Sequence, residues 1–148
     1  MYLDSAIIVK LLVREPESEW FERHLRGHRF ETSDLALSEV CAALLSKERA
    51  KNISQQERIK ANARFFSMLE DEMILLLPLN REVVERARSV QLACHPQVPL
   101  RTLDALHVAT CDLHHRGSMS ATDARIRAAC LQLGIRLIPE KIEDITAK

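Results

Sequence analysis

Hydrophobic positions in this chain form short apolar runs separated by longer stretches with helical spacing. The short runs predict five strands, at residues 2–3, 28–33, 73–79, 118–122 and 135–138. The stretches between them predict helices over about 5–13, 16–26, 35–49, 54–72, 80–92, 102–116 and 123–133. All three glycines, Gly27, Gly117 and Gly134, lie where a helix is expected to end. Strands that alternate with helices predict an α/β fold, with a parallel sheet covered on both faces.

Several segments carry more specific predictions. Ser54 and Glu57 have the spacing of a capping box, which would begin the helix at 54–72. The run 73–79 is continuously apolar, as expected for a strand buried on both faces. The helix at 35–49 is apolar or small nearly all the way round between Leu35 and Leu45, which predicts a buried helix.

The segment 101–125 is predicted to form a helix, a strand and the start of another helix, with an acid at each of two turning points. Thr102 is the expected N-cap of the first helix, and Asp104 would lie in its first turn. The expected apolar face of this helix consists of Leu103, Leu106, Ala109, Thr110 and Leu113. Asp123 follows the strand at 118–122. Either acid could be a simple helix cap, so their positions alone leave the structural and functional interpretations open.

Glu39 is the acid least expected from its surroundings. It lies in the apolar sequence LALSEVCAALL, and no Lys or Arg stands three or four positions away. An ion pair along the helix therefore does not explain it. An isolated carboxylate in such a helix would be costly unless it is paired or bound to a metal ion.

Four acids are expected to meet at one edge of the sheet. Asp4 ends the first strand, Asp123 follows a later strand, Asp104 opens a helix, and Glu39 lies about one turn into another helix. In parallel α/β sheets the carboxyl ends of strands and the N-termini of helices share the ligand-binding edge. Close carboxylates repel by about 4 kcal/mol per pair at an effective dielectric constant near 20. Such a cluster requires protonation or divalent cations, and all-oxygen ligands suit Mg²⁺ or Mn²⁺ in phosphoryl transfer.

Composition narrows the class of protein. The chain has 148 residues, 47% of them hydrophobic, which predicts one globular domain spanning 1–148. The formal net charge is zero, so no overall field indicates a nucleic-acid partner. No glycine remains for a dinucleotide or P-loop motif. Asp4 and Lys10 interrupt the apolar start of the chain, so a signal peptide is not expected. No apolar run is long enough to span a membrane. We therefore expect a cytoplasmic protein. The cysteines show no C-x-x-C spacing and are expected to be reduced.

The ordered set of motifs resembles the PIN-domain nucleases, and is most similar to the VapC-type ribonuclease toxins of bacterial toxin–antitoxin pairs. The resemblance lies in Asp4-Ser5 after an apolar start, the L-x-E-V helix at Glu39, LDALHVAT at Asp104, and Thr122-Asp123 before a helix. It extends over essentially the whole chain. It implies a PIN-like three-layer α/β/α fold with a parallel sheet of about five strands.

The resemblance also implies a site and a reaction. Asp4, Glu39, Asp104 and Asp123 would be the catalytic acids and the ligands of Mg²⁺ or Mn²⁺, and Ser5 and Thr122 would be supporting hydroxyls. The implied reaction is hydrolysis of RNA phosphodiester bonds by water that the cation activates. The implied partners are an RNA substrate, a cognate antitoxin protein and a second copy of the chain in a homodimer.

Three alternatives accompany this hypothesis. His107, Cys111 and His115 are four residues apart on one helix, but three ligands on a straight helix cannot close a tetrahedral zinc site, and His107 is expected in the core or beside the acids. A phosphatase site with Asp4 as the phosphate acceptor would need a second Asp two residues later, where Ala6 stands. A receiver site would need an acidic pair and a later Lys, and this pattern does not fit well either. A non-catalytic module that binds RNA or protein through the same fold is the serious rival, because the segment 47–64 is rich in Lys and Arg.

Overall fold

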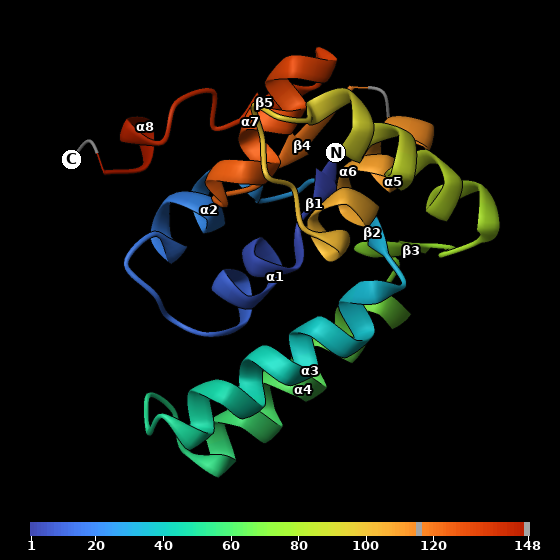
Figure 1. Cartoon of the computed structure of the whole chain (residues 1–148). Coiled ribbons are helices and arrows are strands. Elements are labelled where there is room, and N and C mark those ends of the chain that lie inside the picture. Colours follow the sequence, from blue (N-terminus) through green and yellow to red (C-terminus); the bar gives the residue numbers. More distant parts are fainter. Residues whose placement is uncertain (115–116, 147–148) are drawn as a thin grey trace.

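The computed structural model describes residues 1–114 and 117–146. Its strands are β1 (Tyr2–Leu3), β2 (Phe30–Ser33), β3 (Ile74–Leu77), β4 (Ser118–Ser120) and β5 (Arg136–Ile138). Its helices are α1 (Ser5–Leu12), α2 (Ser18–Leu25), α3 (Leu35–Arg49), α4 (Gln55–Glu70), α5 (Arg81–Cys94), α6 (Thr102–His114), α7 (Ala124–Leu133) and α8 (Glu143–Thr146). Figure 1 shows the strands at the centre and the α3–α4 hairpin projecting away from them.

The five strands form one sheet in the order β3-β2-β1-β4-β5, and every neighbouring pair is parallel. β1 is central, between β2 and β4. The carboxyl ends of these strands therefore share one edge, and Asp4 follows β1 directly at that edge. The predicted parallel α/β sheet is confirmed.

Helices cover both faces of the sheet because side chains of a strand alternate between its faces. Leu3 packs into a core formed with α1, α2, α3 and α4. Tyr2 packs into a second core, which contains side chains of α5, α6 and α7. The predicted three-layer arrangement is confirmed.

Local capping signals account for several helix ends. Ser54 and Glu57 form both hydrogen bonds of the capping box at the start of α4. Gly27 and Gly134 have φ values of 79° and 73°, in the left-handed region that glycine adopts without strain. The helix end predicted at Gly117 depends in part on residues 115–116, which lie outside the described residues. Thr102 is the first residue of α6 and not its N-cap, the role predicted for it.

The prediction of a buried α3 was wrong, and α6 takes that role. Leu37 and Leu45 of α3 are about 40% exposed, because α3 pairs with α4 in the projecting hairpin and only part of its surface faces the core. In α6, by contrast, all residues from Ala105 to Cys111 are buried, whereas Leu103, expected on its apolar face, is 49% exposed. The helix is enclosed by α5 on one side and the sheet on the other.

The prediction that the run 73–79 is buried on both faces was also wrong. β3 is an edge strand, and Leu75 is 42% exposed. An apolar run does not specify whether its strand is central or at an edge, since that depends on the order of strands in the sheet. No helix in the described part of the chain has the length and apolar character needed to cross a membrane.

Candidate functional site

The four predicted acids lie on elements that converge at the carboxyl edge of the central strands. Asp4 stands between β1 and α1, and Asp123 stands between β4 and α7. Glu39 lies in the second turn of α3, and Asp104 lies in the first turn of α6. The structure groups them into two pairs, each held by a basic side chain of the protein.

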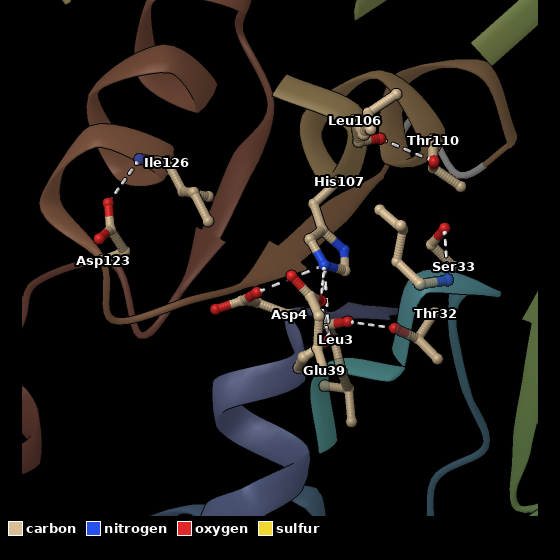
Figure 2. Close-up of polar contacts among 12 residues, drawn as sticks. Leu3, Asp4, Thr32, Ser33, Glu39, Leu106, His107, Thr110, Asp123 and Ile126 are labelled. Carbon is tan, nitrogen blue, oxygen red and sulfur yellow. Dashed lines mark hydrogen bonds and ion pairs between the residues drawn. The ribbon is translucent and has the colours of Figure 1, made fainter. Parts of the chain in front are cut away.

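His107 joins the first pair, Asp4 and Glu39. Its Nε2 lies 2.5 Å from Oε2 of Glu39 and 3.9 Å from Oδ1 of Asp4. The ring is 1% exposed and lies on α6, one turn after Asp104. Figure 2 shows Asp4 and Glu39 both directed at this ring. His107 therefore lies in the core beside the acids, as predicted.

Tyr2 completes a buried chain of hydrogen bonds to Glu39. The backbone N–H of Ser33 donates to the hydroxyl of Tyr2, which lies 2.7 Å from Nδ1 of His107. That hydroxyl can donate to Nδ1 of a neutral ring or accept from Nδ1 of a protonated ring, and in both cases Nε2 carries the proton that faces Glu39. Ser5 Oγ also donates to Oε2 of Glu39, at 2.6 Å. Two donors thus fix the position of the Glu39 carboxylate.

Arg125 joins the second pair, Asp104 and Asp123. Its Nε lies 3.2 Å from Oδ2 of Asp104, and its Nη2 lies 3.0 Å from Oδ2 of Asp123. Asp123 is also the N-cap of α7, since its Oδ1 accepts the backbone N–H groups of Arg125 and Ile126. The structural and functional interpretations of Asp123 are therefore compatible, because capping uses Oδ1 and leaves Oδ2 to pair with Arg125.

Asp4 differs from Asp123 because its side chain makes no capping hydrogen bond. Burial raises the pKa of Asp4 to about 6, and the charges of Glu39 and Asp104 add to this rise, while His107 opposes it. Helix capping does not explain the position of this buried acid. Its pKa also indicates that three of the four carboxylates act on one another electrostatically.

The pKa values of His107 and Glu39 shift in the directions that their contacts predict. Burial alone would lower the pKa of His107, but the hydrogen bond to Glu39 and the charges of Asp4, Glu39 and Asp104 raise it above its usual value. Burial alone would raise the pKa of Glu39, but the hydrogen bond and charge of His107, together with the hydrogen bond from Ser5, lower it. The first pair thus favours a protonated imidazole beside an ionised Glu39.

The donor set suits a hard divalent cation. It consists of carboxylate oxygens that repel one another, which is the chemistry expected for Mg²⁺ or Mn²⁺. In the described part of the chain, no three His, Cys, Asp or Glu side chains already stand together as a metal-binding group. His107 and Arg125 neutralise the two pairs instead. Two of the four acids, Asp4 and Glu39, also line a groove between α1 and α3, together with Ser5.

The sequence did not single out Tyr2 or Arg125. Tyr2 precedes Asp4 and appeared only as a strand residue, and Arg125 resembles any charged residue in the first turn of a helix. Of the two predicted hydroxyls, Ser5 contacts Glu39, and Thr122 lies partly buried in the link between β4 and Asp123. The zinc alternative included His115, which lies outside the described residues.

The chain is similar to known proteins over most of its length. The family model for the PIN domain matches residues 1–130. Ribonuclease VapC46 of Mycobacterium tuberculosis is 38% identical over 144 residues, which cover 93% of this chain and 95% of the relative. A toxin–antitoxin complex from Klebsiella pneumoniae contains a chain with the same fold, with a TM-score of 0.58 and 15% identity over 84% of this chain and 87% of that chain.

Proposed function

This chain belongs to the PIN-domain family, and from that premise we propose that it is a Mg²⁺- or Mn²⁺-dependent endoribonuclease and the toxin of a type II toxin–antitoxin pair. Its similarity to a protein named as a ribonuclease extends over nearly the full length of both chains. The single observation that carries the proposal is the burial of Asp4 at the carboxyl end of β1, where His107 lies between it and Glu39; this burial also raises the pKa of Asp4. Groups with such perturbed pKa values are typical of functional sites.

The metal ligands in this proposal are Asp4, Glu39, Asp104 and Asp123. A bound Mg²⁺ would polarise the scissile phosphate and neutralise charge on the leaving oxygen. Glu39 would offer Oε1, since Ser5 and His107 both donate to Oε2. Asp123 would offer Oδ2, since α7 uses its Oδ1 as a cap.

The chain's own residues prepare this site for substrate. Tyr2 and His107 hold the Glu39 carboxylate in one orientation through the buried hydrogen-bond chain. The groove lined by Asp4, Ser5 and Glu39 continues to Glu15 and Lys47. We propose that the RNA phosphodiester approaches the acids along this groove.

The proposed partners follow from the same premise. A cognate antitoxin would cover or enter the acidic site, and the chain with the same fold from Klebsiella pneumoniae comes from a toxin–antitoxin complex. A homodimer and a cytoplasmic location are also proposed. The four cysteines are free, which agrees with a reducing compartment.

Cleavage of a mixed RNA pool tests the function. Wild type should cut in Mg²⁺ or Mn²⁺ and not in EDTA, and Asp4→Asn and Asp104→Asn should each lose activity by about a hundredfold or more, the scale for loss of a catalytic electrostatic group. Asp71→Asn, at the exposed end of α4, is the matched control and should cut like wild type.

Two results would count against the nuclease. Equal cutting by wild type and by both site variants would indicate a contaminating enzyme. Salt-dependent RNA binding without cleavage, unchanged in a variant that lacks all four acids, would favour the non-catalytic alternative. In that case exposed basic residues of the α3–α4 hairpin, such as Arg49 and Lys60, would be the candidates for phosphate contact.

A further inference from the structure

Arg125 forms an ion pair with each member of the second acid pair. It lies in the first turn of α7, and its side chain is 30% exposed. One end of its guanidinium group faces Asp104 of α6, and the other faces Asp123 at the start of α7. A single positive charge thus lies between two carboxylates that belong to separate elements.

The contact with Asp104 is electrostatic and lacks the geometry of a hydrogen bond. Nε of Arg125 and Oδ2 of Asp104 are both buried without a hydrogen-bond partner, although they lie only 3.2 Å apart. Buried polar atoms in this state cost free energy relative to well-paired ones. Oδ2 of Asp104 therefore remains available for a better-placed cation.

A comparison with Arg127 shows that this arrangement is not required for packing α7. Arg127 is buried, and its guanidinium donates to the backbone carbonyls of Ala121, Pro139 and Glu140. Those bonds fix the segments after β4 and β5 to the helix. Arg125 contacts carboxylates, which are groups that a divalent ion would also bind.

We propose that Arg125 is an internal cation that holds Asp104 and Asp123 in the metal-free protein and must release them when a divalent ion binds. The inference rests on the proposed function and deepens it, because it identifies what the ion displaces. Two carboxylates without a counter-charge would repel, so Arg125 stabilises the metal-free fold. The same positive charge opposes the approach of Mg²⁺, so it weakens metal affinity.

The partial exposure of Arg125 makes this exchange feasible. Its side chain is long and flexible and 30% exposed, so its charged group can turn to solvent without unfolding α7. Asp123 keeps its capping bonds through Oδ1 during the exchange. The helix start therefore remains in place while Oδ2 changes partner.

Calorimetric titration of metal-free protein with Mg²⁺ tests the proposal. Arg125→Gln should bind Mg²⁺ roughly three- to tenfold more tightly than wild type, as expected when one partly exposed like charge is removed. Arg125→Lys keeps the charge but not the planar group, and should fall between the two. Arg88→Gln, at an exposed position of α5, removes the same charge elsewhere and should match wild type. In EDTA, Arg125→Gln should melt at a lower temperature than wild type.

The outcomes separate this inference from the proposed function. Unchanged or weaker Mg²⁺ binding by Arg125→Gln, while wild type binds and Asp104→Asn does not, would overturn the inference alone. Absence of Mg²⁺ binding in both wild type and Arg125→Gln would overturn the metal site as well. Binding by Arg125→Gln that wild type lacks would support the exchange in its strongest form.

Discussion

At the scale of single residues, the site is defined by where charge is buried. Asp4 is 6% exposed and does not cap its helix with its side chain, so its charge has little structural use in the metal-free fold. His107 supplies the nearest positive charge, yet its ring nitrogen lies 3.9 Å from Asp4 and only 2.5 Å from Glu39. Asp4 is therefore the less stabilised member of its pair.

Replacing Asp4 by Asn tests this interpretation. The pKa of Asp4 is raised from 3.8 to about 6 by burial and neighbouring carboxylates, so its stability contribution decreases as pH rises from about 4 to about 6. Asn has no charge to bury. At pH 8 in EDTA, the free energy of unfolding of Asp4→Asn should therefore equal that of wild type or exceed it by up to about 2 kcal/mol. This gain in stability should disappear near pH 4.

Denaturant unfolding of both proteins at pH 4 and pH 8 measures the difference. The variant should also lose most of the stabilisation that Mg²⁺ gives to wild type. A variant clearly less stable than wild type at pH 8 without metal would identify Asp4 as a structural residue.

At the scale of elements, α7 shows how two similar side chains acquire different roles. Arg125 and Arg127 are two residues apart, which places them on different sides of the helix. Arg127 is 8% exposed and connects the carbonyl of Ala121 to those of Pro139 and Glu140. Through these bonds the position of α7, and with it Asp123, depends on the chain segments at the ends of β4 and β5.

Arg127→Met should therefore destabilise the protein strongly. The variant fills similar space but leaves three carbonyls without their donor, two of them on the buried residues Ala121 and Pro139, and we expect a loss of about 2–4 kcal/mol in the free energy of unfolding. Arg136→Met, at an exposed position on β5, should change it by less than about 0.5 kcal/mol. Urea denaturation of the two variants in the same buffer gives the comparison. A loss at Arg127 no larger than at Arg136 would show that water replaces the missing donor.

At the scale of the whole molecule, opposed pKa shifts determine the pH range in which the metal-free fold is most stable. The pKa of Glu39 is lowered by His107 and Ser5 against the effect of burial, and that of Glu15 by Lys10 and Lys47 against the same effect. Each of these acids therefore stabilises the fold at pH values above 4.5, the usual pKa of Glu, and this contribution is lost as the pH falls through the lowered pKa of the folded state. The pKa of His107 is raised, so its contribution is complete below 6.5 and is lost as pH rises through the folded value.

In EDTA the free energy of unfolding should therefore be highest in mildly acidic buffer, at about pH 5–6, and should fall toward pH 8. Mg²⁺ requires ionised carboxylates, so it should stabilise the protein more at pH 8 than at pH 5. Denaturant curves from pH 4 to pH 9, with EDTA or with Mg²⁺, measure both effects. A metal-free stability that rises steadily from pH 5 to pH 9 would contradict the charge arrangement described for His107 and Asp4.

The sequence by itself determined the class of fold and brought out the four candidate acids, for a local physical reason. Helical and strand spacing, the glycines at Gly27 and Gly134, and the capping box at Ser54 are encoded within a few residues of the chain. The acids were conspicuous because an unpaired carboxylate in apolar surroundings is costly, and Glu39 and Asp4 both stood in such segments.

Only the tertiary structure decided how these acids are paired and which elements are buried. Strand order placed β3 at an edge, and the α3–α4 hairpin exposed a helix that its composition predicted to be enclosed. Tyr2 reaches His107 across 105 positions of sequence, and Arg125 reaches Asp104 from a different helix. Such contacts depend on packing between distant segments, and no local pattern of residues specifies them.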